Sequence, residues 1–77
     1  MEQEYYGWIF VEEKLPLLDE NVLIAYVEED DKDVEYMVTR RCKQKIIYTE
    51  TEKWMLPQYY KQSCVRAWRK IPVFTVI

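Results

Sequence analysis

Histidine is absent from this 77-residue sequence, and glycine occurs once. Without histidine the chain cannot form a Ser–His or Cys–His nucleophile pair or a histidine-containing zinc site. A single glycine is too few for the common glycine-rich loops that hold phosphates. The two cysteines, Cys42 and Cys64, cannot make a four-cysteine metal site. These absences predict a protein that is not an enzyme, has no metal site and uses no cofactor.

Long apolar runs are also missing, since no stretch approaches the roughly 20 apolar residues that span a membrane. The acidic start, from Met1 to Glu4, does not have the pattern of a signal peptide. Cys42 and Cys64 lie outside any paired-cysteine motif, which favours reduced thiols over a disulfide across neighbouring strands. We therefore expect a cytoplasmic protein that does not contact a membrane.

The chain nevertheless has the material for a core, because 49% of its residues are hydrophobic and 16% are aromatic. This composition argues against disorder. A chain of this length is too short for two ordinary domains, so residues 1–77 are predicted to form one domain. Trp8, Trp54 and Trp68 are expected to fill the core rather than to stack on a ligand. One tyrosine of the pair Tyr59-Tyr60 would face a partner if that segment is extended.

Short β-branched and aromatic runs between charged or proline-containing segments predict an all-antiparallel arrangement of strands. Residues 21–41 have the pattern of a hairpin with a charged turn. The expected fold is mainly β, a small curled antiparallel sheet or partly open barrel, with at most one short helix near 54–62; a β-rich α+β fold is the alternative. The predicted strands are 7–11, 21–28, 34–41, 45–52 and 63–71, and the tail 73–77 is expected to be an edge strand or a contact with another chain.

Charge divides the sequence into two unlike halves. Residues 1–35 carry a net charge of −10, whereas residues 36–77 carry +7. The simplest interpretation is that the halves fold against each other and their charges interleave on the surface. Opposite charges on one protomer also suit self-association into a homo-oligomer.

The acidic residues gather around the predicted turn of the 21–41 hairpin. A solvated turn is their simplest structural interpretation. Their functional interpretation is an acidic edge that binds a basic protein, or that covers a nucleic-acid-binding groove by imitating its charge. The residues of this acidic edge are Glu28, Glu29, Asp30, Asp31 and Asp33.

Basic residues beside aromatic ones in the second half suggest a different ligand. Such side chains can hold a phosphate and stack on a base, which would suit capture of a nucleotide. Direct nucleic-acid binding is less favoured because the first half is acidic. The residues of this basic–aromatic set are Arg40, Arg41, Arg66, Trp68, Arg69 and Lys70.

The order of landmarks along the chain resembles a family of small phage and prophage proteins, the domain of unknown function 551. The resemblance covers about residues 7–72. Its landmarks here are Trp8-Ile9-Phe10-Val11, Glu12-Glu13, Leu15-Pro16, Val22-Leu23-Ile24, Trp54, and Trp68 followed by Pro72.

This resemblance implies a setting rather than an activity, because the family has no established one. It implies a small accessory protein of a mobile element, made inside a bacterial cell, where such proteins often interfere with host systems. The expected function is therefore non-enzymatic binding and inhibition of a host protein, such as a defence nuclease. The alternative is an oligomer that sequesters a nucleotide or nucleotide signal through the basic–aromatic set.

Overall fold

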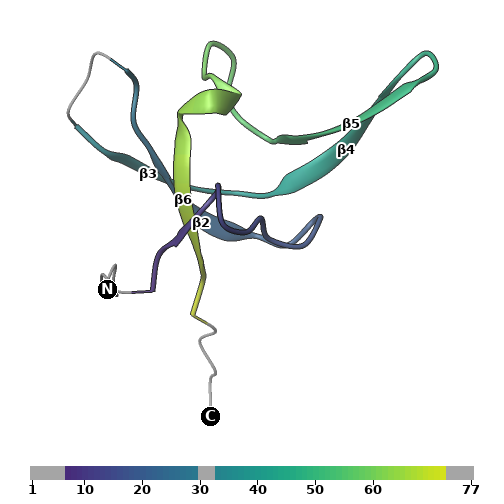
Figure 1. Cartoon of the computed structure of the whole chain (residues 1–77). Coiled ribbons are helices and arrows are strands. Elements are labelled where there is room, and N and C mark those ends of the chain that lie inside the picture. Colours follow the sequence, from purple (N-terminus) through teal and green to yellow (C-terminus); the bar gives the residue numbers. More distant parts are fainter. Residues whose placement is uncertain (1–6, 30–32, 73–77) are drawn as a thin grey trace.

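Strands dominate the architecture of this chain (Figure 1). The computed structural model describes residues 7–29 and 33–72. Within these ranges the only helical element is one short 3₁₀ turn, η1, so the expectation of a mainly β fold is confirmed. The elements are β1 (Ile9–Phe10), β2 (Val22–Tyr26), β3 (Glu35–Thr39), β4 (Arg41–Ile46), β5 (Thr49–Trp54), η1 (Gln62–Cys64) and β6 (Val65–Lys70).

The larger sheet has four antiparallel strands in the order β1-β6-β2-β3. β2 and β3 form the hairpin predicted for residues 21–41, with Ile24 paired to Met37. The last strand, β6, lies between β1 and β2, and pairs Trp68 with Ile24. Alternation along β2 buries Val22, Ile24 and Tyr26 on one face. The last strand of the sequence, β6, is therefore an inner strand of this sheet, with a neighbour on each side.

The second sheet is a separate hairpin of β4 and β5, which we call the hairpin arm (residues 41–54). Its strands are joined by the two-residue turn Ile47-Tyr48, because Ile46 pairs with Thr49. The prediction of one continuous strand over 45–52 was wrong, since the chain reverses at its middle. Figure 1 shows the arm extending away from the rest of the molecule. Neither sheet of the described residues closes into a barrel.

The core lies where the base of the hairpin arm meets the larger sheet. Trp54 and Trp68 are buried there, as expected, whereas Trp8 is half-buried against Tyr36, with ring centroids 5.8 Å apart. Cys64 is buried in this core and Cys42 is partly exposed, and both are free thiols. Among the described residues no helix has the length and hydrophobicity needed to cross a bilayer. The tail 73–77, predicted as an edge strand or contact, lies outside the described residues. The buried core is made of Val22, Ile24, Tyr26, Trp54, Cys64, Val65 and Trp68.

Candidate functional site

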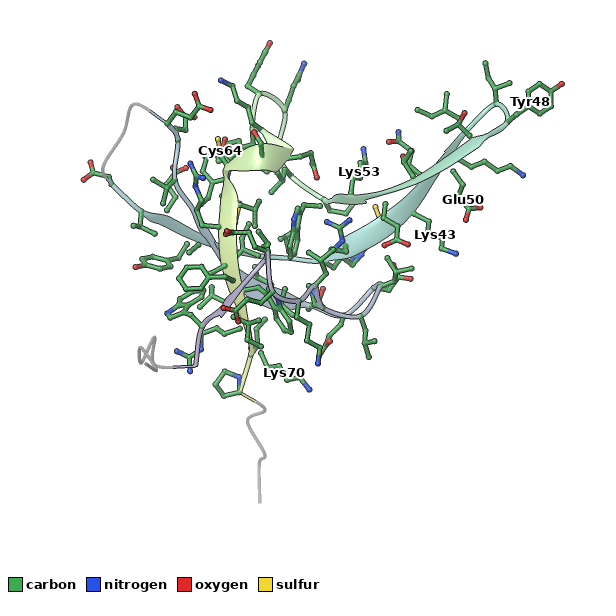
Figure 2. All side chains as sticks on the ribbon, viewed as in Figure 1. Lys43, Tyr48, Glu50, Lys53, Cys64 and Lys70 are labelled. Carbon is green, nitrogen blue, oxygen red and sulfur yellow. The ribbon has the colours of Figure 1, made fainter. Side chains whose placement is uncertain are left out.

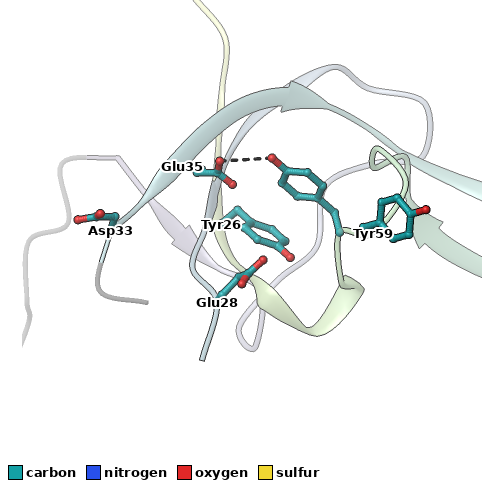
Figure 3. Close-up of a pocket in the computed structure, with 6 residues that line it drawn as sticks. Tyr26, Glu28, Asp33, Glu35 and Tyr59 are labelled. Carbon is teal, nitrogen blue, oxygen red and sulfur yellow. Dashed lines mark hydrogen bonds between the residues drawn. The ribbon is translucent and has the colours of Figure 1, made fainter. Parts of the chain in front are cut away.

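A cavity of about 240 Å³ opens beside the β2–β3 hairpin, at the end where the acidic edge was predicted (Figure 3). Carboxylates come from the hairpin, and most of the aromatic wall comes from the segment that precedes η1. We call it the acidic tyrosine pocket. Its lining residues are Tyr26, Glu28, Asp33, Glu35, Tyr59 and Tyr60.

Tyr26 forms the floor of this pocket. It is the last residue of β2 and is 1% exposed, so its ring is fixed by the core. Its hydroxyl accepts a hydrogen bond from the backbone N–H of Lys61 at 2.9 Å. The neighbouring Tyr60 ring lies with its centroid 4.8 Å from that of Tyr26. This hydrogen bond and ring contact attach the 59–61 segment to the hairpin, although the two are far apart in sequence.

Two features set the upper rim. The Tyr60 hydroxyl donates a hydrogen bond to Oε1 of Glu35 at 3.3 Å, the dashed line in Figure 3. Tyr59 is 88% exposed and has a φ of 76°, a left-handed conformation that is uncommon outside glycine. Tyr59 lies within a turn from Pro57 to Tyr60, which is closed by a hydrogen bond of 3.1 Å from the Tyr60 N–H to the Pro57 carbonyl. The turn therefore leaves one tyrosine in the pocket and the other at its open edge.

Two phenols of the pocket, Tyr60 and Tyr26, have a pKa raised above its ordinary value. For Tyr60 the hydrogen bond to Glu35 is the largest cause, followed by the negative charge of Glu35 and by burial. For Tyr26 the bond from Lys61 lowers the pKa, but burial, Cys64 and the charge of Glu28 together outweigh it, and the net shift is upward. Both phenols are thus neutral at physiological pH. The pocket presents carboxylate charge next to neutral aromatic faces.

This arrangement suits an organic cation better than a metal ion. The described residues contain no group of three or more histidine, cysteine or acidic side chains placed to hold a metal. Figure 3 shows Asp33 at the outer side of the pocket, away from Glu28 and Glu35. Separated carboxylates cannot converge on one small ion, but they can surround a bulky cation that also rests on an aromatic face.

The predicted acidic edge overlaps this pocket in part. Glu28 and Asp33 line it, and Glu29 is an exposed neighbour in the chain. Asp30 and Asp31 lie outside the described residues. Sequence reasoning missed Glu35 and Tyr26 as members of the site. Both residues could have been inferred from the predicted hairpin, because Tyr26 and Glu35 flank its turn and pair with each other across the two strands.

The basic–aromatic set is not brought to one place. The Arg66 guanidinium bonds the carbonyl of Val27 at 3.3 Å, and Trp68 is only 2% exposed, so its ring has no free face for a base. Arg69 lies over Trp8, at 5.7 Å from the ring centroid, and Arg41 lies over Trp54.

The remaining members of the set are also spread over the molecule. Arg40 is exposed between β3 and β4. Arg69 and Lys70 line an apolar cavity of about 280 Å³ beside Leu23 and Val38, whereas Arg41 lines a different cavity. The residues that the sequence groups as one phosphate site are thus distributed over several surfaces.

Another exposed feature was not anticipated from the sequence. The turn of the hairpin arm presents three apolar side chains, and Tyr48 at its end is 98% exposed. Figure 2 shows Tyr48 at the far end of the arm, with Lys43 and Glu50 along its length. Lys43 Nζ and Glu50 Oε1 form an ion pair at 3.3 Å across the two strands. Both side chains of this pair are solvent-exposed, so its contribution to stability is about 1 kcal/mol at most.

Comparison of the chain with models of known families, with curated proteins and with solved structures finds no match. The resemblance to the domain of unknown function 551 therefore stays a prediction.

Proposed function

We propose that this chain is a non-enzymatic binding protein whose acidic tyrosine pocket receives a lysine or arginine side chain of a partner protein. The observation that carries the proposal is the juxtaposition of three carboxylates and three tyrosine rings around one cavity of about 240 Å³. A cationic side chain placed there is attracted by the carboxylates and by the electron-rich rings of Tyr59 and Tyr60, which are more exposed than the ring of Tyr26.

Magnitudes favour a protein partner over a free small cation. An exposed cation–π contact contributes about 0.5–1 kcal/mol, and an exposed ion pair about 0–1 kcal/mol. Two or three such contacts reach only about 2–3 kcal/mol, short of the roughly 4 kcal/mol that corresponds to millimolar affinity. A useful affinity therefore needs further contact area around the pocket, which a folded partner can supply.

The setting implied by the family resemblance narrows the choice of partner. In that setting the chain is an accessory protein of a phage or another mobile element, and the partner is a protein of the bacterial host. Nucleases of host defence carry basic surfaces because they bind nucleic acid. Occupation of such a surface by an acidic protein would inhibit the nuclease, so we propose this class as the target.

The experiment uses a fluorescent oligolysine peptide and the full-length chain at low salt, with binding followed by anisotropy. The variant is the double substitution Glu28→Gln and Glu35→Gln, which removes two carboxylates of the pocket. We expect roughly tenfold weaker binding, because each lost contact is worth about 0.7 kcal/mol.

A matched control carries Glu12→Gln and Glu13→Gln, which changes the net charge equally at two exposed residues outside the pocket. This control should keep most of the affinity. Equal weakening by both double variants would show that the peptide responds only to net charge, and the proposed site would be abandoned.

A further inference from the structure

A second cavity lies at the junction of the hairpin arm with the larger sheet, and its chemistry is opposite to that of the acidic tyrosine pocket. Its volume is about 450 Å³, within the range of small-molecule sites. One side is apolar, and the other carries Arg41 and Lys53 of the arm. We call it the junction cavity. Its lining residues are Val11, Leu15, Arg41, Glu52, Lys53, Trp54, Gln62, Ser63 and Val65.

Arg41 is the residue of this cavity with an unsatisfied polar group. Its Nε atom is buried and has no hydrogen-bond partner among the described residues. A buried donor without a partner costs about as much free energy as a lost hydrogen bond, so such atoms in native proteins call for an explanation. The guanidinium is held over the Trp54 ring, with Cζ 5.2 Å from the ring centroid. The guanidinium is thus kept in place by a stacking contact, while its buried Nε–H group remains unpaired.

The backbone around Arg41 is fixed as well. Its carbonyl accepts a hydrogen bond from the N–H of Asp19 at 2.7 Å, and it pairs with Trp54 across the arm. Gln62 anchors Trp54 in turn, since its side-chain amide bonds both backbone groups of that residue. Arg41 is therefore presented on a rigid base, which lowers the entropy cost of binding a ligand.

The lining also contains a counter-charge. Glu52 lies two residues before Trp54 on β5 and shares the cavity with Arg41 and Lys53. Its carboxylate would repel an incoming anion. The balance of one acid against two bases leaves the cavity with a formal charge of +1.

We infer that the junction cavity binds a small organic anion, a carboxylate or a phosphate monoester attached to an apolar or planar group. The anionic end would meet the fork of Arg41 donors, which matches the geometry of both groups. The apolar end would rest on Val11, Leu15 and Val65. Because this site shares no residue with the acidic tyrosine pocket, the inference does not depend on the proposed function.

The test titrates the isotopically labelled full-length chain with benzoate and with phenyl phosphate, and follows the Nε–H resonance of Arg41 by NMR. Both probes carry a ring, and they differ in the anionic group. Benzamide, which has the ring without the charge, is the control ligand. We expect the Arg41 signal to shift with at least one of the two anions and not with benzamide; the relative affinities of the two anions identify the preferred group.

Two variants connect the shift to the residues named. Arg41→Lys keeps the charge and removes the fork, and should weaken anion binding about fivefold by loss of a charge-assisted hydrogen bond. Glu52→Gln removes the repelling carboxylate and should strengthen binding. Glu52 is exposed, so its variant keeps the test decisive if Arg41→Lys fails to fold. Absence of any shift with both anions, or affinity unchanged by Glu52→Gln, would overturn the inference.

Discussion

The side-chain amide of Gln62 bonds both backbone groups of Trp54. Its Oε1 accepts the Trp54 N–H at 2.6 Å, and its Nε2 donates to the Trp54 carbonyl at 2.8 Å. This is the pattern that a neighbouring strand would make. The side chain thus completes the outer edge of β5 at the point where the hairpin arm joins the core.

Replacing Gln62 by leucine should destabilise the protein by about 1–3 kcal/mol, because both Trp54 groups lose their partner in a partly buried place. Urea denaturation measures this loss, and hydrogen exchange should show faster exchange at the Trp54 amide. Gln58→Leu, at an exposed turn residue, serves as the control. Equal stability of the two variants would mean that the bidentate contact contributes nothing.

Thr39 provides a second link between the sheets, because its hydroxyl donates a hydrogen bond to the Met55 carbonyl. Thr39 is 7% exposed. Thr39→Val keeps the shape and removes the donor, and we expect a loss of about 1–2 kcal/mol in the free energy of unfolding. Thr51→Val, on the exposed part of β5, should change stability little. A variant at residue 39 as stable as the parent would contradict the role given to this bond.

Ile47 is held in an unfavourable backbone conformation, with a φ of 54° in the two-residue turn of the hairpin arm. A positive φ costs an ordinary residue about 1–2 kcal/mol, whereas glycine adopts it freely and is preferred at the first position of such turns. Ile47→Gly should therefore raise the melting temperature. Tyr48→Gly is the control, since Tyr48 does not have a positive φ. A lower melting temperature for Ile47→Gly would show that the isoleucine side chain stabilises the turn by contacts.

The hydrogen bond from Tyr60 to Glu35 predicts a pH dependence. Because it raises the pKa of Tyr60 above 10.0 in the folded state, its stabilisation is complete below the unfolded pKa and is lost as pH rises through the folded pKa. An ultraviolet absorbance titration of the tyrosines should show one group ionising at lower pH in Glu35→Gln than in the parent. Superimposable titration curves would rule out the assigned cause.

The hairpin over residues 21–41 was predictable because a charged turn separates two runs of strand-forming residues. The hairpin arm was not. Its turn, Ile47-Tyr48, contains none of the glycine, asparagine or aspartate that marks a two-residue turn. Instead, the β-branched Ile47 and the aromatic Tyr48 extend the sequence pattern of a strand. A local preference for strand was overruled by pairing between β4 and β5.

The candidate site was half predictable for a related reason. Acidic residues near the hairpin turn are visible in the sequence as a cluster, and Glu28 and Asp33 do line the pocket. The tyrosine wall depends on contacts between distant segments, such as the bond from the Lys61 N–H to Tyr26. The periodicity of the sequence carries no information on which distant segments come into contact. The basic–aromatic set was predicted on the assumption that neighbours in sequence share a surface. The fold places these residues on different surfaces instead.

The most direct test of the central claim is to locate the bound cation. The isotopically labelled chain is titrated with the oligolysine peptide, and the changes in its NMR spectrum are mapped onto the structure. We predict that the largest changes fall on Glu28, Glu35 and Tyr60, together with the ring signals of Tyr26 and Tyr59. Changes that are largest at Glu12 and Glu13, or that follow acidic residues everywhere in equal measure, would contradict it.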